Sequence, residues 1–299
     1  MELGKVVLLV AMSAFGLAFA AVWWARRRED RAAAGASARA TTTRFVAIGF
    51  VTNFFDTLGI GSFATTTTIF RALKAIDDLH IPGTLNVGHT IPTIAQALIF
   101  ITVVEVETAT LLAMIAASVV GAWLGAGFVA SLPRRTIRVA MGALLFVAAG
   151  FMLMRLLGLT PPGGEALALR GGLLVLAVVA NFVLGVLMML GIGLYAPCMV
   201  LVSLLGMNPR AAFPIMMGSC AFLMSAAGVR FVRRGSFDEP ASFGLTLGGV
   251  PAVLIAGLIV KELPLDVVRW LVVVVVLYTA TSLLQAGLAE RTAKKESDG

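Results

Sequence analysis

Long stretches without any charged residue constrain the fold of this chain more than any other feature. Eight such stretches run for 16 residues or more: 6–25, 79–104, 108–133, 139–154, 171–209, 211–229, 240–260 and 270–289. A helix crosses a bilayer with about 20 apolar residues, so most of these stretches fit one crossing each. With 59% hydrophobic and 13% charged residues, the composition excludes an ordinary soluble domain and predicts a lipid bilayer as the surroundings.

The net charge of +7 indicates loops on one side of a membrane rather than a nucleic-acid partner. Basic residues concentrate on the cytoplasmic side, so the clusters predicted to be cytoplasmic are Arg26/Arg27/Arg28, Arg134/Arg135/Arg138, Arg230/Arg233/Arg234 and Arg291/Lys294/Lys295. Cys198 and Cys220 lie inside apolar stretches without metal-ligand spacing. We therefore expect no disulfide framework, no metal and no cofactor.

The first apolar stretch ends in Trp23-Trp24 and the arginine cluster, which is an aromatic belt followed by a stop-transfer signal rather than a signal peptide. Residues 1–25 are thus predicted to form a transmembrane helix with an extracytoplasmic N-terminus. Residues 26–44 are predicted to form a solvated cytoplasmic linker, and residues 289–299 a cytoplasmic tail.

Two regions do not fit a single crossing. Residues 45–70 contain Asp56 and the interruption Gly59-Ile60-Gly61, and the 39 residues of 171–209 would span about 58 Å as one helix. The positive-inside rule places both ends of each region on the same side of the membrane. Both regions are therefore predicted to be broken, re-entrant elements.

An internal repeat accounts for both interruptions. Leu-Gly-Ile-Gly occurs at 58–61 and again at 190–193. Leu132-Pro133 recurs as Leu263-Pro264, and Gly88 recurs as Gly218, at nearly the same offset. The sequence thus predicts two units, 45–157 and 171–288, joined by an extracytoplasmic loop at 158–170.

Each predicted unit holds one broken element and three crossings, and an odd number of crossings turns the second unit upside down. The expected fold is an all-α polytopic membrane protein with two inverted-topology repeats and one extra N-terminal helix. Inverted repeats built on broken helices are typical of secondary transporters, with the substrate site between the repeats.

A helix that begins inside the bilayer exposes unpaired N–H groups and the positive end of its dipole, which an anion satisfies. The predicted donors are Gly61, Ser62 and Phe63 in one unit and Gly193, Leu194 and Tyr195 in the other. Glycine lets the backbone approach a ligand closely. The alternative is that the two Gly-Ile-Gly runs only allow close helix packing.

Hydroxyl groups lie close to the first interruption. Thr65 and Thr68 share a helix face and are candidate donors to an oxyanion, although such hydroxyls also bond back to the carbonyl four residues earlier. In the second unit, Tyr195, Pro197 and Cys198 occupy the matching region, which predicts an asymmetric site.

Asp56 is the only carboxylate placed within the membrane, and buried charges there are usually functional. It is a candidate to carry a proton, to help bind a coupling cation or to cap the following half-helix. His89 is predicted either to pair with Asp56, to face the substrate or to be a hydrogen-bonded structural histidine. Ser219 follows Gly218 as His89 follows Gly88, so it occupies the equivalent place in the second unit.

These motifs resemble the TauE/SafE sulfite exporter family, also called the toluene sulfonate uptake permease family. The resemblance lies in Gly59-Ile60-Gly61-Ser62-Phe63-Ala64-Thr65, in Gly191-Ile192-Gly193-Leu194-Tyr195-Ala196-Pro197, and in Gly121-Ala122-Trp123-Leu124-Gly125-Ala126-Gly127 through Leu132-Pro133. It covers about 45–288 and implies transport of sulfite, sulfonates or related organic anions across the bacterial inner membrane.

The expected function is therefore a secondary transporter of a small anion that works by alternating access, and not an enzyme. The predicted substrate-binding residues are Gly59, Gly61, Ser62, Phe63, Thr65, Thr68, His89, Gly191, Gly193, Tyr195, Cys198 and Ser219, with Asp56 as the coupling residue. A proton- or cation-coupled carrier of another small solute centred on Asp56, a channel of the same fold, and a homodimer are left open.

Overall fold

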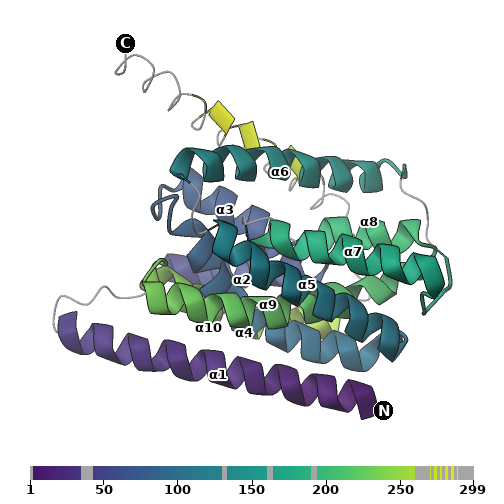
Figure 1. The fold of residues 1–299 in the computed structure, drawn as a ribbon. Helices are drawn as coiled ribbons and strands as arrows, with labels where there is room; N and C mark the ends of the chain where they lie inside the picture. Colours follow the sequence, from purple (N-terminus) through teal and green to yellow (C-terminus); the bar gives the residue numbers. More distant parts are fainter. Residues whose placement is uncertain are drawn as a thin grey trace.

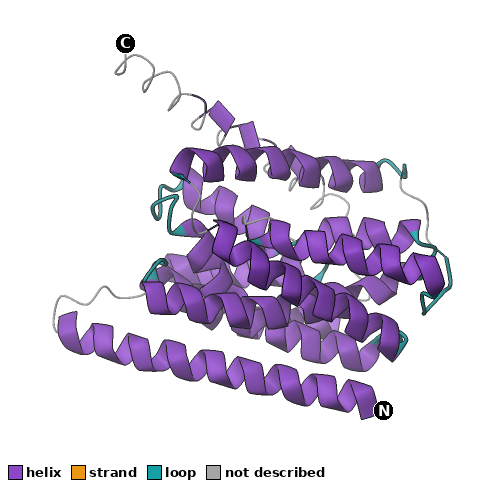
Figure 2. Cartoon of the chain, viewed as in Figure 1, coloured by secondary structure: helices purple, strands orange, loops and turns teal. Residues whose placement is uncertain are grey.

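The structure is a computed structural model that describes residues 3–34, 43–129, 133–159, 164–189 and 194–259, with scattered residues from 270 to 288. These residues are nearly all helical and contain no sheet, only an isolated bridge between Ala166 and Met207 (Figure 2). Six helices are long and apolar enough to cross a membrane: Leu3–Asp30, Ile81–Val103, Thr108–Gly125, Gly171–Met188, Pro209–Arg234 and Glu239–Leu258. The prediction of an all-α polytopic membrane protein is confirmed.

The helices follow one another with short connections. They are α1 (Leu3–Ala34), α2 (Thr43–Thr57), α3 (Ser62–Ala72), α4 (Ile81–Val103), α5 (Thr108–Val129), α6 (Arg134–Leu156), α7 (Gly171–Met188), α8 (Tyr195–Leu204), the 3₁₀ turn η2 (Pro209–Ala211), α9 (Ala212–Arg234) and α10 (Glu239–Ile259). In Figure 1, α1 lies along one edge of the bundle, α6 lies along the opposite edge, and the others lie between them.

Local sequence fixes several helix ends. Pro82 stands in the first turn of α4, where its missing N–H costs nothing. Gly235 ends α9 in the left-handed conformation, with φ of 62°. The Asp238 carboxylate then accepts a hydrogen bond from the Ala241 N–H, 3.0 Å away, at the start of α10.

The described helices repeat at a nearly constant spacing along the chain. Helix α9 starts and ends at the same offset after α4, since 212 − 81 and 234 − 103 both equal 131. The starts of α5 and α10 have that offset too, and the starts of α3 and α8 differ from it by only two positions. We call α2–α5 the first unit and α7–α10 the second. The landmark Leu263-Pro264 and most of the predicted crossing at 270–289 lie outside the described residues.

Each main contact between a helix of the first unit and a helix of the second has a counterpart between the two corresponding helices. Helix α2 packs on α10 of the other unit, α7 packs on α5 of the other unit, and α4 and α9 pack on each other. Glycines bring the backbones together in both the α2–α10 pair and the α5–α7 pair. A Cβ at Gly248 of α10 would collide with the Val46 carbonyl oxygen, and one at Gly121 of α5 would collide with that of Phe182. The core is therefore built between the units rather than inside each one.

Each broken element folds back on itself. Phe45 near the start of α2 contacts Phe70 near the end of α3, with ring centroids 6.0 Å apart. Beyond the end of α8, the Asn208 N–H donates to the carbonyl of Ala166, 2.8 Å away, in the segment that leads into α7. The chain thus leaves each pair of helices close to where it entered.

The predicted linker at 26–44 begins later than expected. Helix α1 continues to Ala34, well beyond the predicted end of the first transmembrane helix at residue 25. Arg27 is buried rather than solvated: its Nη1 lies 2.5 Å from Glu239 Oε1, and its guanidinium carbon lies 3.3 Å from the centroid of the Phe243 ring. The part of the predicted linker at 26–34 is thus helical, with Arg26, Arg28 and Glu29 exposed, whereas the carboxylate and the aromatic ring of α10 stabilise Arg27 inside the protein.

Candidate functional site

The helix break between α2 and α3 is built by glycines. Gly59 and Gly61 have φ of 85° and 91°, which side-chain-bearing residues rarely adopt. Helix α3 begins at Ser62, as the Gly59-Ile60-Gly61 interruption predicts. The matching Gly191 and Gly193 lie outside the described residues, which end at 189 and resume at 194. On either side of that gap, α7 ends at Met188 and α8 begins at Tyr195.

Asp56 stands at the centre of this break. Its Oδ1 accepts a hydrogen bond from the Ser62 backbone N–H, 2.5 Å away, in the first turn of α3. Its Oδ2 accepts a second bond from Gln96 Nε2 of α4, at 2.9 Å. The residue is 2% exposed. Of the roles considered for Asp56, capping α3 is the contact present in the structure.

Gln96 connects the two units through its side-chain amide. Besides Asp56, its Nε2 donates to Thr57 Oγ1 at 3.0 Å, and its Oε1 accepts from the Tyr195 hydroxyl of α8 at 2.9 Å. The predicted set of site residues did not include Gln96. The available signal was its polarity inside the uncharged stretch 79–104, because a buried amide in a membrane helix needs partners.

A small cavity adjoins Asp56. It offers about 10 Å³, close to what one water molecule needs. Its lining residues are Asp56, Gly61, Ser62, Phe63, Thr93, Met188, Leu194, Tyr195, Cys220 and Met224. None of them is Arg or Lys, and the starts of two helices, α3 at Ser62 and α8 at Tyr195, bring positive potential to the cavity.

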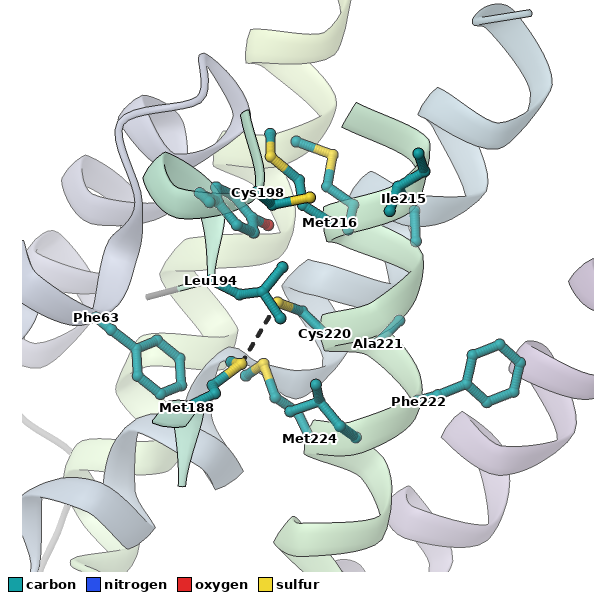
Figure 3. Packing of buried hydrophobic residues seen from close by; sticks show 14 of the residues in the cluster. Phe63, Met188, Leu194, Cys198, Ile215, Met216, Cys220, Ala221, Phe222 and Met224 are labelled. Atoms are coloured by element: carbon teal, nitrogen blue, oxygen red, sulfur yellow. Dashed lines mark hydrogen bonds between the residues drawn. The ribbon is translucent and has the colours of Figure 1, made fainter. Parts of the chain in front are cut away.

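The two units supply different chemistry to the cavity. The first unit contributes the polar side chains Asp56, Ser62 and Thr93, whereas the second contributes three sulfur-containing side chains, Met188, Cys220 and Met224, together with Tyr195. Cys220 Sγ lies 3.6 Å from Met188 Sδ, and Phe63 points toward Met188 (Figure 3). Asp56 and Met188 hold equivalent positions, because each lies three positions before the first glycine of its Gly-Ile-Gly run.

His89 lies in a separate buried chain of hydrogen bonds. Its Nδ1 lies 3.0 Å from Asn53 Oδ1 and its Nε2 lies 3.1 Å from Thr66 Oγ1, with all three residues fully buried. Both ring nitrogens are thus engaged by neutral groups. The option that His89 pairs with Asp56 is wrong because Asn53, one turn earlier on α2, occupies the Nδ1 side.

The second unit also contains a buried polar pair, whose Asn181 was not among the predicted site residues. Asn181 of α7 donates to Ser219 Oγ at 3.3 Å and to the Met114 carbonyl at 2.7 Å. Ser219 follows Gly218 on α9 as His89 follows Gly88 on α4, but Asn181 lies four positions before residue 185, the counterpart of Asn53 by the spacing that relates Asp56 to Met188. The two pairs therefore join matching helices, although the residues on α2 and α7 are not at matching positions.

The remaining predicted residues lie close to the cavity without lining it. Thr65 Oγ1 donates to the carbonyl of Gly61 at 3.1 Å, and Thr68 Oγ1 donates to that of Ala64 at 2.9 Å. Both hydroxyls therefore follow the backbone-bonded alternative. Gly59 lies behind the break against Phe213, and Cys198 is buried in the core. Their part in substrate binding stays a prediction.

No metal centre is indicated by the described residues, which contain no group of three His, Cys, Asp or Glu side chains able to hold a metal ion.

Comparison with known proteins agrees with this arrangement. The family described as "Sulfite exporter TauE/SafE" matches residues 2–152, which contain α1, the first unit and nearly all of α6. Searches of curated proteins and of solved structures found no match to the chain. Since the family match covers half of the 299 residues and the helices suit a bilayer, the chain belongs to the TauE/SafE sulfite exporter family of multi-pass membrane transporters.

Proposed function

We propose that the protein is a secondary transporter that moves a small sulfur-containing or organic anion across the bacterial inner membrane by alternating access. The observation that supports this most directly is the start of α3 at a buried cavity without basic side chains. An anion there interacts with backbone N–H groups and the positive end of the α3 dipole. Leu194 and Tyr195, at the start of α8, line the same cavity from the other unit.

The two units are inverted repeats in this proposal, with boundaries at 45–157 and 171–288. Two observations support this proposal. Helices of one unit pack on the other unit as their counterparts do, and the ends of α3 and α8 lie near the starts of α2 and α7, as expected for two re-entrant elements among seven crossings. The arginine clusters place the N-terminus outside and the C-terminus in the cytoplasm.

The two units place different side chains at the cavity, which favours a substrate with a charged end and an apolar or sulfur-containing end. An oxyanion group suits Ser62 and Thr93 of the first unit, whereas polarisable sulfur and methyl groups of the second unit suit the sulfur atom or short apolar part of a sulfite or sulfonate. This is the reason to prefer sulfur-containing anions over more hydrophilic ones.

The cavity is too small for the substrate in this conformation. A space that holds about one water molecule has no room for a polyatomic anion such as sulfite. Opening requires the α2–α10 pair to move relative to the α5–α7 pair, which is the rocking motion expected between inverted repeats. The methionines on the second unit's side can repack during that motion because their side chains are flexible.

Two other functions rest on the same residues. A cation carrier centred on Asp56 is supported by the buried carboxylate, and a channel is supported by the shared fold. Uptake of a labelled anion distinguishes an anion transporter from the cation carrier, which takes up a labelled cation instead. Counterflow that saturates with substrate distinguishes a transporter from a channel.

The test is uptake of sulfite and of methanesulfonate by liposomes that contain the purified protein. Gly61→Val should reduce transport at least tenfold, because a β-branched residue at φ of 91° disturbs the start of α3. No atom lies within 4 Å of a Cβ at Gly61, so the folded protein has room for the change.

Gly150→Val in α6 is the matched control, since a Cβ at Gly150 also meets no atom within 4 Å and its backbone is an ordinary helix. It should transport at the wild-type rate. Wild-type transport by Gly61→Val would contradict the placing of the substrate at the start of α3.

A further inference from the structure

The Asp56 carboxylate already occupies the place where the substrate anion is proposed to bind. We propose that Asp56 acts as a resident anion at the start of α3, and that each substrate anion displaces it while Asp56 takes up one proton. This inference rests on the proposed transport of an anion and adds how a proton is coupled to it.

The contacts of Asp56 support the first part of this inference. Its two oxygens accept hydrogen bonds from the Ser62 N–H at 2.5 Å and from Gln96 Nε2 at 2.9 Å. An N–H at a helix start that serves a carboxylate is not available to a second anion at the same time. The substrate must therefore replace the carboxylate at Ser62 before it can use this donor.

Charge explains why the displaced carboxylate takes up a proton. The titratable groups that face the cavity with Asp56 are Tyr195 of α8 and Cys220 of α9, and neither is a cation. On α4, both ring nitrogens of His89 are engaged by Asn53 and Thr66. On α10, which also packs on α2, the sole titratable residue is Glu239, paired with Arg27. Two negative charges about 4 Å apart in a protein would weaken anion binding by on the order of a thousandfold.

Gln96 is able to hold both forms of Asp56. Its NH₂ group donates to the carboxylate, as observed, and its Oε1 has a second lone pair besides the one used by the Tyr195 hydroxyl. A protonated Asp56 can donate its O–H to that oxygen. The amide therefore stabilises the side chain before and after protonation without an added charge.

The step conserves charge for a singly charged substrate. In the resting site the carboxylate carries −1; after binding, the carboxylic acid is neutral and the anion carries −1. The proton enters from the aqueous side that is open to the substrate, and it returns to water when the anion leaves and the carboxylate rebinds Ser62. One anion and one proton consequently cross together, without net movement of charge.

The experiment measures sulfite binding to the purified full chain in detergent by calorimetry, from mildly acidic to mildly alkaline pH. Coupled uptake of one proton makes wild-type affinity fall by about tenfold per pH unit, beyond the change caused by sulfite's own protonation. Asp56→Asn keeps an oxygen that accepts from Ser62 but takes up no proton. We expect it to bind sulfite with only the pH dependence of sulfite itself.

Asp238→Asn is the matched control, because Asp238 also accepts a backbone N–H at a helix start, from Ala241 at 3.0 Å, but lies away from the cavity. It should show the wild-type pH dependence. An Asp56→Asn protein that folds and either keeps the wild-type pH dependence or binds no sulfite overturns the inference.

A second measurement covers the case in which Asp56→Asn does not fold. Wild-type binding heats in two buffers with different heats of ionisation count the protons taken up with each sulfite. About one proton is expected beyond sulfite's own, and none overturns the inference. A wild-type protein that neither binds nor carries sulfite or methanesulfonate contradicts the proposed function instead, whereas sulfite transport without the extra proton contradicts this inference alone.

Discussion

At the scale of single residues, buried polar side chains join corresponding helices in the two units. Asn53 bonds with His89 across α2 and α4, and Asn181 bonds with Ser219 across α7 and α9. A polar group inside an apolar bundle is costly unless it has a partner, so these pairs fix how the helices face each other. The asymmetry at the cavity is then a difference in the side chains that the two units place there.

His89 should contribute to stability rather than bind substrate. In His89→Ala the buried Asn53 and Thr66 each lose a partner, and each loss costs roughly 1–3 kcal/mol. We expect the free energy of unfolding, measured by denaturant titration in detergent, to fall by about 2–6 kcal/mol. His80, the other histidine of the chain, is exposed, and His80→Ala should change it by less than about 0.5 kcal/mol. Equal effects of the two substitutions would contradict this assignment.

At the scale of helices, the α2–α10 and α5–α7 pairs, each with one helix from each unit, hold the bundle together, and α1 packs on its outside. Helix α1 packs on α9, α4 and α5, and its Arg27 reaches Glu239 at the start of α10. The Arg27 and Glu239 side chains are only 8% and 18% exposed. This contact explains why α1 stays helical beyond its predicted end.

Arg27 offers a direct measure of how firmly α1 is attached. Removing one partner of a buried ion pair is strongly destabilising, so Arg27→Ala should lower the free energy of unfolding by about 3 kcal/mol. Arg26, one residue earlier, pairs with Asp30 at the surface, with side chains 44% and 45% exposed. Arg26→Ala should cost no more than about 0.5 kcal/mol. Chemical denaturation in detergent checks both, and a small effect of Arg27→Ala would show that α1 is held by apolar packing alone.

At the scale of the whole molecule, the proposed inversion makes the α2–α3 hairpin and the α7–α8 hairpin enter the membrane from opposite sides. The first hairpin returns at 73–80, before α4, and the second returns at 205–210, before α9. A substrate bound between the two hairpins would be open first to one side of the membrane and then to the other as the α2–α10 pair rocks against the α5–α7 pair. In the proposed function, this geometry of the two hairpins is what would link the inverted repeats to alternating access.

Cysteine labelling in intact cells tests this arrangement. Leu79→Cys and Arg210→Cys place a thiol at exposed positions after the first and the second hairpin. The two native cysteines are buried and should give little background with a membrane-impermeant reagent. We expect residue 210 to react from outside and residue 79 only after the membrane is opened. Labelling of both positions from the same side would contradict the inverted repeats.

The helical membrane class, the break at Gly59–Gly61 and the spacing of the helices in the two units could all be predicted from the amino-acid sequence. These features depend on runs of apolar residues, on glycine conformation and on periodic similarity, all of which are local properties of the chain. The position of Asp56 beside the first half-helix belongs to the same group, because Asp56 and Ser62 are close neighbours in the sequence.

The partners of the buried polar residues depend on how the helices pack on one another. Gln96 lies far along the chain from both Asp56 and Tyr195, and His89 lies on a different helix from Asn53. Such pairs follow from how helices rotate and cross, which no local property of the chain fixes. The sequence offered both a substrate anion and Asp56 for the start of α3, and in the folded chain the Asp56 carboxylate accepts the Ser62 N–H there.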